Sequence, residues 1–299
     1  MESIDYLQTE EFADHDLELL KLNVRSLDLT SIIEYRGGEE VENEDILFVL
    51  EQLNWSLNRL ANGRINNSTL DRVRKMHGGW YILPFYGLAD RAQTDYFRLK
   101  PTNPPADRKK PGKFKKYLGA EGVSPRAYCP NVTEGLWATI AARYSVEKSG
   151  NDFWEWILDH PEIPVIITEG EKKAYAGLAA GYVVVSLPGI DCGYKSSSDS
   201  DDGSGGKLSL IPDLKTLATD GRTILIAFDR DANPQTVKRV QRARKELAKL
   251  FAQLGCETRS IKWDDQYKGL DDFIFGGGQE ALDKAIESAQ NLTPSLKPI

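Results

Sequence analysis

From Pro164 onward, short apolar runs alternate with segments of helical pattern, and this alternation limits the possible folds more than any other feature of the chain. The apolar runs read PVIIT, YVVVS, TILIAF and ETRSIKW, and between them lie segments such as GEKKAYAGLAA and TVKRVQRARKELAKLFAQL. Strands that alternate with helices favour a mostly parallel sheet with helices on both faces. We therefore predict an α/β domain over residues 161–290, followed by a tail at 291–299.

Two further segments are expected ahead of this domain. In residues 1–75 apolar side chains recur at helical spacing, which predicts a helical segment with one packing face; they include Ile46, Leu50, Leu53, Leu57 and Leu60. In residues 76–160 the short aromatic runs GGWYILPFYG and TDYFRLK predict a small α+β subdomain. Within the α/β domain, the polar run GYKSSSDSDDGSGG predicts a mobile surface loop.

The composition narrows the function classes. The chain has 299 residues and a net charge of −7, which excludes a wholly basic nucleic-acid coat protein but leaves room for a local basic groove. No apolar run approaches the ~18 residues of a membrane span, and the acidic start MESIDYLQTEEF is not a secretory signal. We therefore expect a cytoplasmic protein without a membrane partner. The separated Cys129, Cys192 and Cys256 predict neither a disulfide framework nor a zinc pair.

Acidic residues follow three of the predicted strands. Glu169 follows the first strand, Asp229 and Asp231 follow the third, and Asp271 and Asp272 come after the fourth. Ligands of parallel sheets gather beyond the carboxyl ends of the strands, and two side chains at i and i+2 can face the same way. Close carboxylates repel unless a cation joins them, and an all-oxygen site suits Mg²⁺ or Mn²⁺. The alternative for Asp231 is a capping or turn role.

Basic residues are concentrated in the proline-rich run PTNPPADRKKPGKFKK. This run is either a solubilising loop or an arm that contacts phosphates, and its cations are Arg108, Lys109, Lys110, Lys113, Lys115 and Lys116. Lys172 lies at the start of the helix beside Glu169, so it is a candidate phosphate contact, with an ordinary helix surface as the alternative. The cations of the long helix TVKRVQRARKELAKLFAQL do not share one face, which favours a solvated surface.

TEGEKKA, followed about 60 residues later by FDRDAN, resembles the TOPRIM domain that DnaG-type primases, topoisomerases and some nucleases share. The resemblance covers residues 164–289. It implies that Glu169, Asp229 and Asp231 are the metal-binding and catalytic acids, and it makes Asp271 and Asp272 secondary candidates.

The order PFYG, YFRLK and KKYLGAEG is similar to the N-terminal subdomain of DnaG-type RNA polymerase cores. The match departs at Gly119 and Ala120, where that family has asparagine and serine. It implies that Arg98 and Lys116 screen phosphate charge. The basic loop 108–116, which includes Lys113 and Lys115, would then bind the template or the incoming triphosphate. As a whole, the chain resembles primase-like proteins of plasmids and phages.

The resemblance implies a DNA primase, a metal-dependent nucleotidyltransferase that makes short primers on single-stranded DNA from nucleoside triphosphates. The alternatives are a TOPRIM nuclease and a non-catalytic nucleic-acid-binding replication accessory protein. The module PFYG…FRLK…KYL favours the primase, because a nuclease does not need it. The sequence has no Walker A loop, so a replicative helicase partner would lie on a continuation or a separate chain. The cysteines of a primase zinc domain are absent, so initiation is expected to be weak, unspecific or assisted by residues 1–75.

Overall fold

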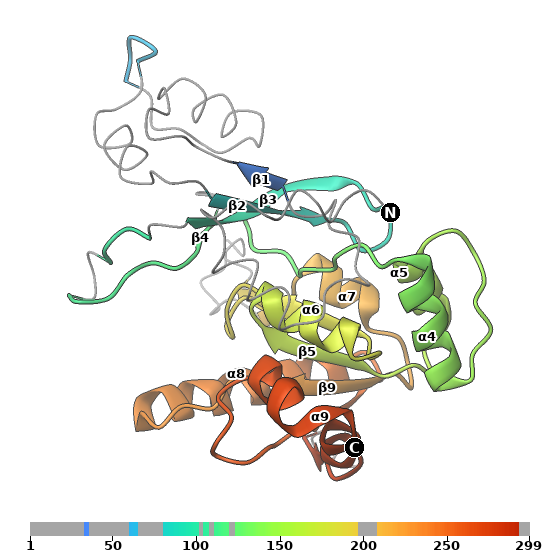
Figure 1. The fold of residues 1–299 in the computed structure, drawn as a ribbon. Helices are drawn as coiled ribbons and strands as arrows, with labels where there is room; N and C mark the ends of the chain where they lie inside the picture. The colour runs from blue at the N-terminus through green and yellow to red at the C-terminus, as the bar shows by residue number, and fades with distance from the viewer. Residues whose placement is uncertain are drawn as a thin grey trace, which may run out of the picture. The chain divides into compact units, whose positions relative to one another are not determined.

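The computed structural model describes residues 33–35, 60–64, 80–101, 104–107, 111–119, 123–196 and 208–292 (Figure 1). The chain divides into two compact units. The first comprises Met1–Leu17, Leu29–Phe85 and Ala92–Ser124, and the second comprises Glu18–Asp28, Tyr86–Arg91 and Pro125–Ile299. Each unit is described by itself.

The first unit contains a four-stranded sheet in the order β1–β2–β3–β4. Its strands are Ile33–Tyr35, Trp80–Tyr86, Gln93–Pro101 and Leu118–Gly119. β1 pairs antiparallel with β2, and β3 pairs antiparallel with β4. Phe85 and Tyr96 are both buried and meet edge to face with ring centroids 4.8 Å apart, an arrangement that aromatic pairs prefer. The predicted small β unit is therefore present.

The described part of residues 1–75 differs from the predicted helix. Ile33–Tyr35 is an edge strand, because its backbone pairs with β2 from Ile33 opposite Ile82 to Tyr35 opposite Trp80. Leu60 lies before a turn and is 48% exposed, so it is not part of a buried stripe. The rest of the helical prediction, including Ile46, Leu50, Leu53 and Leu57, lies outside the described residues.

The second unit is built on a five-stranded sheet in the order β11–β10–β9–β5–β6. β5, β6, β9 and β10 are parallel, and β11 closes one edge antiparallel to β10. This confirms the predicted mostly parallel α/β sheet, whose apolar strands are buried on both faces. The strands are β5 Val165–Glu169, β6 Val184–Leu187, β9 Thr223–Ala227, β10 Glu257–Ser260 and β11 Gln290–Asn291.

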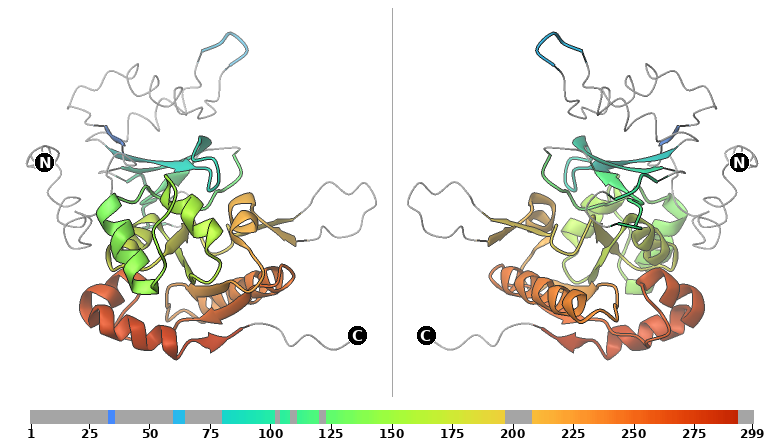
Figure 2. Two further views of the ribbon diagram at one scale, coloured as in Figure 1. Left: turned by 90° about the vertical axis from the view of Figure 1, so that its right-hand side faces the viewer. Right: turned by 90° about the vertical axis from the view of Figure 1, so that its left-hand side faces the viewer.

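Helices surround this sheet, as Figures 1 and 2 show. α6 packs against β6 and α9, and α8 packs against β10. Among the described residues, no helix is both long enough and apolar enough to cross a membrane. The helices are α4 Glu134–Tyr144, α5 Phe153–Asp159, α6 Glu171–Ala179, α7 Pro212–Leu217, α8 Pro234–Ala252 and α9 Leu270–Glu287.

Residues from Pro125 onward belong to the second unit, although the sequence placed the start of the α/β domain at residue 161. The reason is that the preceding segment pairs with the sheet. Tyr128 N donates to Ser186 O at 2.7 Å, and Ser186 N donates back to Tyr128 O at 3.2 Å. In addition, the buried guanidinium of Arg222 donates to the carbonyl oxygens of Ile157 and Ile163, which holds the end of α5 to the sheet.

The predicted mobile loop and the predicted tail each adjoin a described strand. The predicted mobile loop lies largely outside the described residues, and β7 Tyr194–Ser196 pairs antiparallel with β8 Leu208–Leu210 on either side of it. In the predicted tail at 291–299, Asn291 belongs to β11, and residues 293–299 lie outside the described part.

Candidate active site at the carboxyl edge of the parallel sheet

The ends of β5 and β9 bring two predicted acids to the same edge of the sheet. The parallel register pairs Thr168 with Ala227, and Glu169 and Asp229 follow this pair by one and by two residues on their own strands. The hydroxyl of Thr168 also donates to Ala227 O at 2.8 Å and ties the two strand ends together. Gly170 then takes φ 93° and ψ 134°, a conformation in which glycine is favoured, and α6 begins at the next residue.

A lysine from α6 lies among these acids. Lys173 Nζ is 3.2 Å from Asp229 Oδ1, and the two side chains are only 16% and 23% exposed. Burial lowers the pKa of Lys173, but Asp229, Asp271 and Glu169 together outweigh it, so this pKa is raised above its ordinary value. The lysine is therefore held as an ammonium ion. Burial raises the pKa of Asp229, and this effect outweighs the opposing effect of Lys173.

Asp271 joins the same cluster from the first turn of α9. The evidence is the space around Gly269, the residue just before this helix. A Cβ atom at Gly269 would lie 2.4 Å from Lys173 Cε, 2.6 Å from Asp271 Oδ1 and 3.2 Å from Asp229 Oδ1. The three side chains thus converge on one point, which only a glycine leaves open. We call Glu169, Asp229 and Asp271 the acid cluster, with Lys173 as its cation.

The structure distinguishes Asp271 from Asp272. Asp271 is half-buried and influences both Lys173 and Asp229, whereas Asp272 is exposed. Neighbouring residues of a helix point in different directions, which accounts for the difference. The sequence ranked the two acids equally as secondary candidates, and the fold brings only Asp271 into the cluster.

One carboxylate oxygen of Asp231 has the turn role that was the alternative to metal binding. It is exposed, and its Oδ1 accepts a hydrogen bond from Asn233 N at 2.7 Å. Asn233, not Asp231, caps α8, because its side chain accepts from Gln235 N at 2.9 Å. Within the described part of the chain Asp231 Oδ2 has no hydrogen bond, so this oxygen remains open to a ligand.

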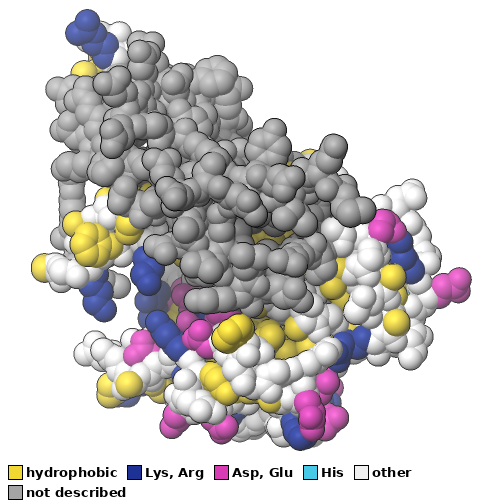
Figure 3. Space-filling model, in the orientation of Figure 1, with side chains coloured by type: hydrophobic (Ala, Val, Ile, Leu, Met, Phe, Trp, Pro, Cys, Tyr) yellow, Lys and Arg dark blue, Asp and Glu magenta, His cyan; other side chains and the backbone are white. Residues whose placement is uncertain are grey.

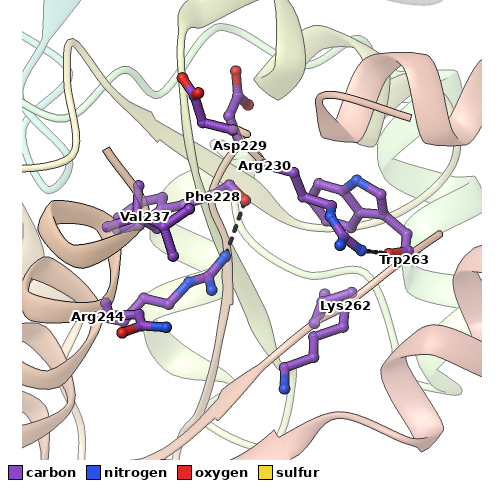
Figure 4. A pocket seen from close by; sticks show the side chains of 11 residues that line it. Phe228, Asp229, Arg230, Val237, Arg244, Lys262 and Trp263 are labelled. Atoms are coloured by element: carbon purple, nitrogen blue, oxygen red, sulfur yellow. Dashed lines mark hydrogen bonds between the residues drawn. The ribbon is translucent and has the colours of Figure 1, made fainter. Parts of the chain in front are cut away.

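Arg230, between the two aspartates, points away from them. Its backbone N donates to Lys268 O at 2.9 Å, and its guanidinium donates to Trp263 O and pairs with Asp265. These contacts fasten the segment that leads from β10 to α9, and so help to place Asp271. Figure 4 shows Arg230 reaching toward Trp263 while Asp229 points elsewhere.

A cavity of about 250 Å³ opens beside the strand ends. Arg244 enters its wall from α8 and donates from Nη2 to Phe228 O at 3.0 Å (Figure 4). Burial, and secondarily Arg230, lowers the pKa of Arg244. The cavity is lined by Phe228, Asp229, Arg230, Asp231, Val237, Val240, Gln241, Arg244, Ile261, Lys262 and Trp263.

The donor set of the acid cluster suits a hard divalent cation in its chemistry, because all its ligands are carboxylate oxygens. Within the described residues, however, no group of three or more Asp, Glu, His or Cys side chains is arranged to hold a metal ion. The position among Asp229 and Asp271 is approached instead by the Lys173 side chain. A metal ion at these acids would therefore have to share them with the ammonium group of Lys173.

The predicted cations of β3 and of the basic loop 108–116 belong to the first unit. Arg98 is on β3, and its guanidinium stacks on the Tyr117 ring at 4.5 Å from the centroid. Lys113, Lys115 and Lys116 are exposed, and the strand-like pairing of Ala106 with Phe114 supports their segment. Arg108, Lys109 and Lys110 lie outside the described residues. All of these belong to the first unit, while the acid cluster belongs to the second.

The sequence prediction chose Lys172 as the phosphate contact at the start of α6, but the lysine that lies beside Asp229 is Lys173. Lys172 is half-buried and its Nζ atom is buried, so the ammonium is not presented at the surface. Lys173 was not singled out, although it lies four residues after Glu169, one turn into the helix. That spacing was the signal, since a side chain in the first turn can reach back over the strand end.

On the face shown in Figure 3, acidic and basic side chains of the described residues are interspersed. The described side chains on this face therefore form no single acidic patch.

A family model and a longer protein sequence match parts of the chain. Residues 153–281 match the family model described as "Domain of unknown function (DUF3854)". An uncharacterized protein of Picosynechococcus sp. is 36% identical over 273 residues, which are 89% of this chain and 25% of that protein. The chain thus spans about a quarter of the length of this relative.

Two solved structures are similar over 96% of this chain. The DnaG primase catalytic domain bound to single-stranded DNA has a TM-score of 0.51 and 16% identity, with 77% of that chain covered. The RNA polymerase domain of Mycobacterium tuberculosis primase DnaG, in complex with a double-stranded DNA oligomer with a 6-nucleotide overhang, has a TM-score of 0.50 and 14% identity, again with 77% covered. The likeness shows that the chain has the fold of DnaG-type primase catalytic cores.

Proposed function

We propose that this chain, which has the fold of DnaG-type primase catalytic cores, is a metal-dependent nucleotidyltransferase that makes short primers on single-stranded DNA. The observation that carries the proposal is the meeting of Asp229 and Asp271 with Lys173 beyond the strand that ends at Glu169. Partly buried carboxylates are costly for folding, so their concentration at the ligand-binding edge of a parallel sheet favours a catalytic role.

The reaction joins two nucleotides. A 3′-hydroxyl oxygen attacks the α-phosphorus of a nucleoside triphosphate and gives its proton to water, the bond from that phosphorus to the bridging oxygen breaks, and pyrophosphate leaves. A bound Mg²⁺ or Mn²⁺ would lower the pKa of the hydroxyl and neutralise charge on the attacking and leaving oxygens. The residues that would hold it are Glu169, Asp229, Asp271 and the open oxygen of Asp231.

The chain's own cations have separate tasks in this proposal. Lys173 holds Asp229 in place and offsets the repulsion among the acids. In the first unit, Arg98 offers a planar guanidinium to phosphate, and Lys113, Lys115 and Lys116 offer exposed point charges to the template or the incoming triphosphate. The proposed partners are single-stranded DNA and nucleoside triphosphates, and a replicative helicase is a candidate partner.

The decisive assay incubates the protein with single-stranded DNA, ribonucleotides or deoxyribonucleotides, and Mg²⁺ or Mn²⁺. We expect products longer than a dinucleotide. Asp229→Asn should reduce their yield on the order of 100-fold or more, because it removes a ligand charge at little change of shape. The matched control is Glu155→Gln, which changes an exposed acid of α5 in the same unit and should leave the yield unaltered.

The same assay distinguishes the alternatives. Shortening of the DNA by the wild type but not by Asp229→Asn would indicate the nuclease. DNA binding with neither synthesis nor cleavage would indicate the accessory protein. Circular dichroism of Asp229→Asn shows whether a lost activity reflects the site or the fold.

A further inference from the structure

Lys173 lies where a cation of the acid cluster belongs. Its Nζ atom is 3.2 Å from Asp229 Oδ1, and its Cε atom and Asp271 Oδ1 lie within 2.4 and 2.6 Å of the same point, the absent Cβ of Gly269. Glu169 contributes to the field at the ammonium group. The lysine thus lies between Asp229 and Asp271, two of the carboxylates that the proposed function assigns to a metal ion, and within the influence of a third, Glu169.

Gly269 leaves room for this arrangement. The Lys173 stem passes Gly269 so closely that any side chain there would collide with Cε. At Gly170 a Cβ atom would lie 3.7 Å from Lys173 Nζ, which is an ordinary contact distance. Lys173 is 16% exposed, so its position is set by packing and not only by attraction in water. Buried charges are retained when they are paired, and this lysine has its partners at hand.

The charge balance explains what the lysine does there. Asp229 and Asp271 approach one point and Glu169 lies at the same edge of the sheet, and carboxylates gathered in this way repel each other unless positive charge is supplied. One ammonium supplies one unit of that charge as a compact, hydrated group on a flexible stem. A divalent ion would supply two units but would demand several oxygen ligands around it. With Asp229 already engaged by Lys173, fewer oxygens remain for metal ions.

We propose that Lys173 replaces one divalent ion of the acid cluster and stays in place when the remaining site is loaded. This inference rests on the proposed function, because it concerns the same acids. Lys173 is then a positioning residue that acts through Asp229. Its removal should let the cluster take one more divalent ion.

The test is a titration of the full chain with MnCl₂, followed by calorimetry and by the electron paramagnetic resonance signal of free Mn²⁺. Lys173→Met keeps much of the side-chain volume and removes the charge. We expect it to bind one more Mn²⁺ per chain than the wild type. Lys173→Arg, which keeps the charge, should bind the wild-type number. Lys284→Met, on the exposed surface of α9, is the matched control and should change nothing.

Two results would overturn the inference. One is an equal number of bound ions in the wild type and Lys173→Met with equal affinity, which would mean that the lysine occupies no cation position. The other is an equal number with tighter binding in the variant, which would mean that the lysine leaves when the ion binds. Thermal melting followed by circular dichroism confirms that each variant is folded.

The proposed function has its own readout in the same experiment. Asp229→Asn should bind fewer Mn²⁺ ions than the wild type. If it binds the same number, the proposed metal site fails, whereas the comparison of wild type with Lys173→Met still decides the role of the lysine.

Discussion

Arg126 donates two hydrogen bonds to the carboxylate of Asp213, from Nε to Oδ2 at 2.7 Å and from Nη2 to Oδ1 at 2.6 Å. Asp213 is 2% exposed, and its Oδ2 also accepts from Ala127 N at 3.0 Å. The aspartate lies in the first turn of α7, where a negative charge is favoured. The pair thus ties the start of the long second-unit segment to a helix 87 positions away in the chain.

Breaking this pair should destabilise the protein strongly. Asp213→Ala leaves a half-buried guanidinium and a buried backbone N without their acceptor, so we expect the free energy of unfolding to fall by about 3 kcal/mol. Urea unfolding followed by circular dichroism measures it. Lys284→Met disrupts the exposed pair with Glu280 and should cause no measurable change. Equal effects of the two variants would show that the Arg126–Asp213 pair contributes nothing.

Gly269→Ala should disturb the acid cluster more than the fold. The new methyl group would meet Lys173 Cε, Asp271 Oδ1 and Asp229 Oδ1, all of which belong to side chains that can move. We expect weaker Mn²⁺ binding by calorimetry and only a small loss in melting temperature. The control is Gly135→Ala in α4, where the methyl group meets nothing within 4 Å. It should stabilise the helix by about 0.5–1 kcal/mol. Unaltered Mn²⁺ binding in Gly269→Ala would refute the claim that a side chain at this position displaces the groups of the acid cluster.

Two substitutions at Asp231 separate its turn role from a metal-ligand role. Asp231→Asn retains an oxygen that can accept from Asn233 N, whereas Asp231→Ala loses both this acceptor and the charge. If Asp231 is a metal ligand, both variants should lose primer synthesis on the order of 100-fold, and only Asp231→Ala should also lower the melting temperature. Full activity in Asp231→Asn would restrict the residue to the turn.

Alkaline pH should destabilise the second unit through Tyr144. Burial raises the pKa of this tyrosine to about 12, from an ordinary value near 10. Its neutral form is thus favoured by folding, so the stabilisation is present below pH 10 and is lost as the pH rises toward 12. The slope is up to about 1.4 kcal/mol per pH unit for this one group. Urea unfolding measures this slope. Between pH 9 and about 12, the free energy of unfolding should fall less steeply with pH in Tyr144→Phe than in the wild type. Parallel curves for the two proteins would contradict the assignment.

The two acids at the strand ends show which part of the site could be predicted from the sequence. Glu169 and Asp229 were predictable because each follows an apolar run, and the ends of parallel strands meet at one edge of a sheet whatever the details of packing. The parallel α/β sheet followed from the same alternation of strands and helices. Local signals of this kind depend only on neighbouring residues.

The short strand Ile33–Tyr35 shows the first kind of limit. A three-residue edge strand exists only through its pairing with β2, and its partner lies some 47 residues away, so no local pattern marks it. The same holds for the segment from Pro125, which the sequence separated from the sheet although Tyr128 pairs with Ser186.

The sequence by itself determined that acids would stand at the carboxyl edge of a parallel sheet, because the order of apolar runs and carboxylates is written along the chain. Only the tertiary structure decided that Asp271 and not Asp272 joins them, that Lys173 provides the cation and that Gly269 makes the room. These three residues come together through the packing of α6 and α9. Which side chains share one point in space depends on helix rotation and close contact, which a linear pattern does not specify.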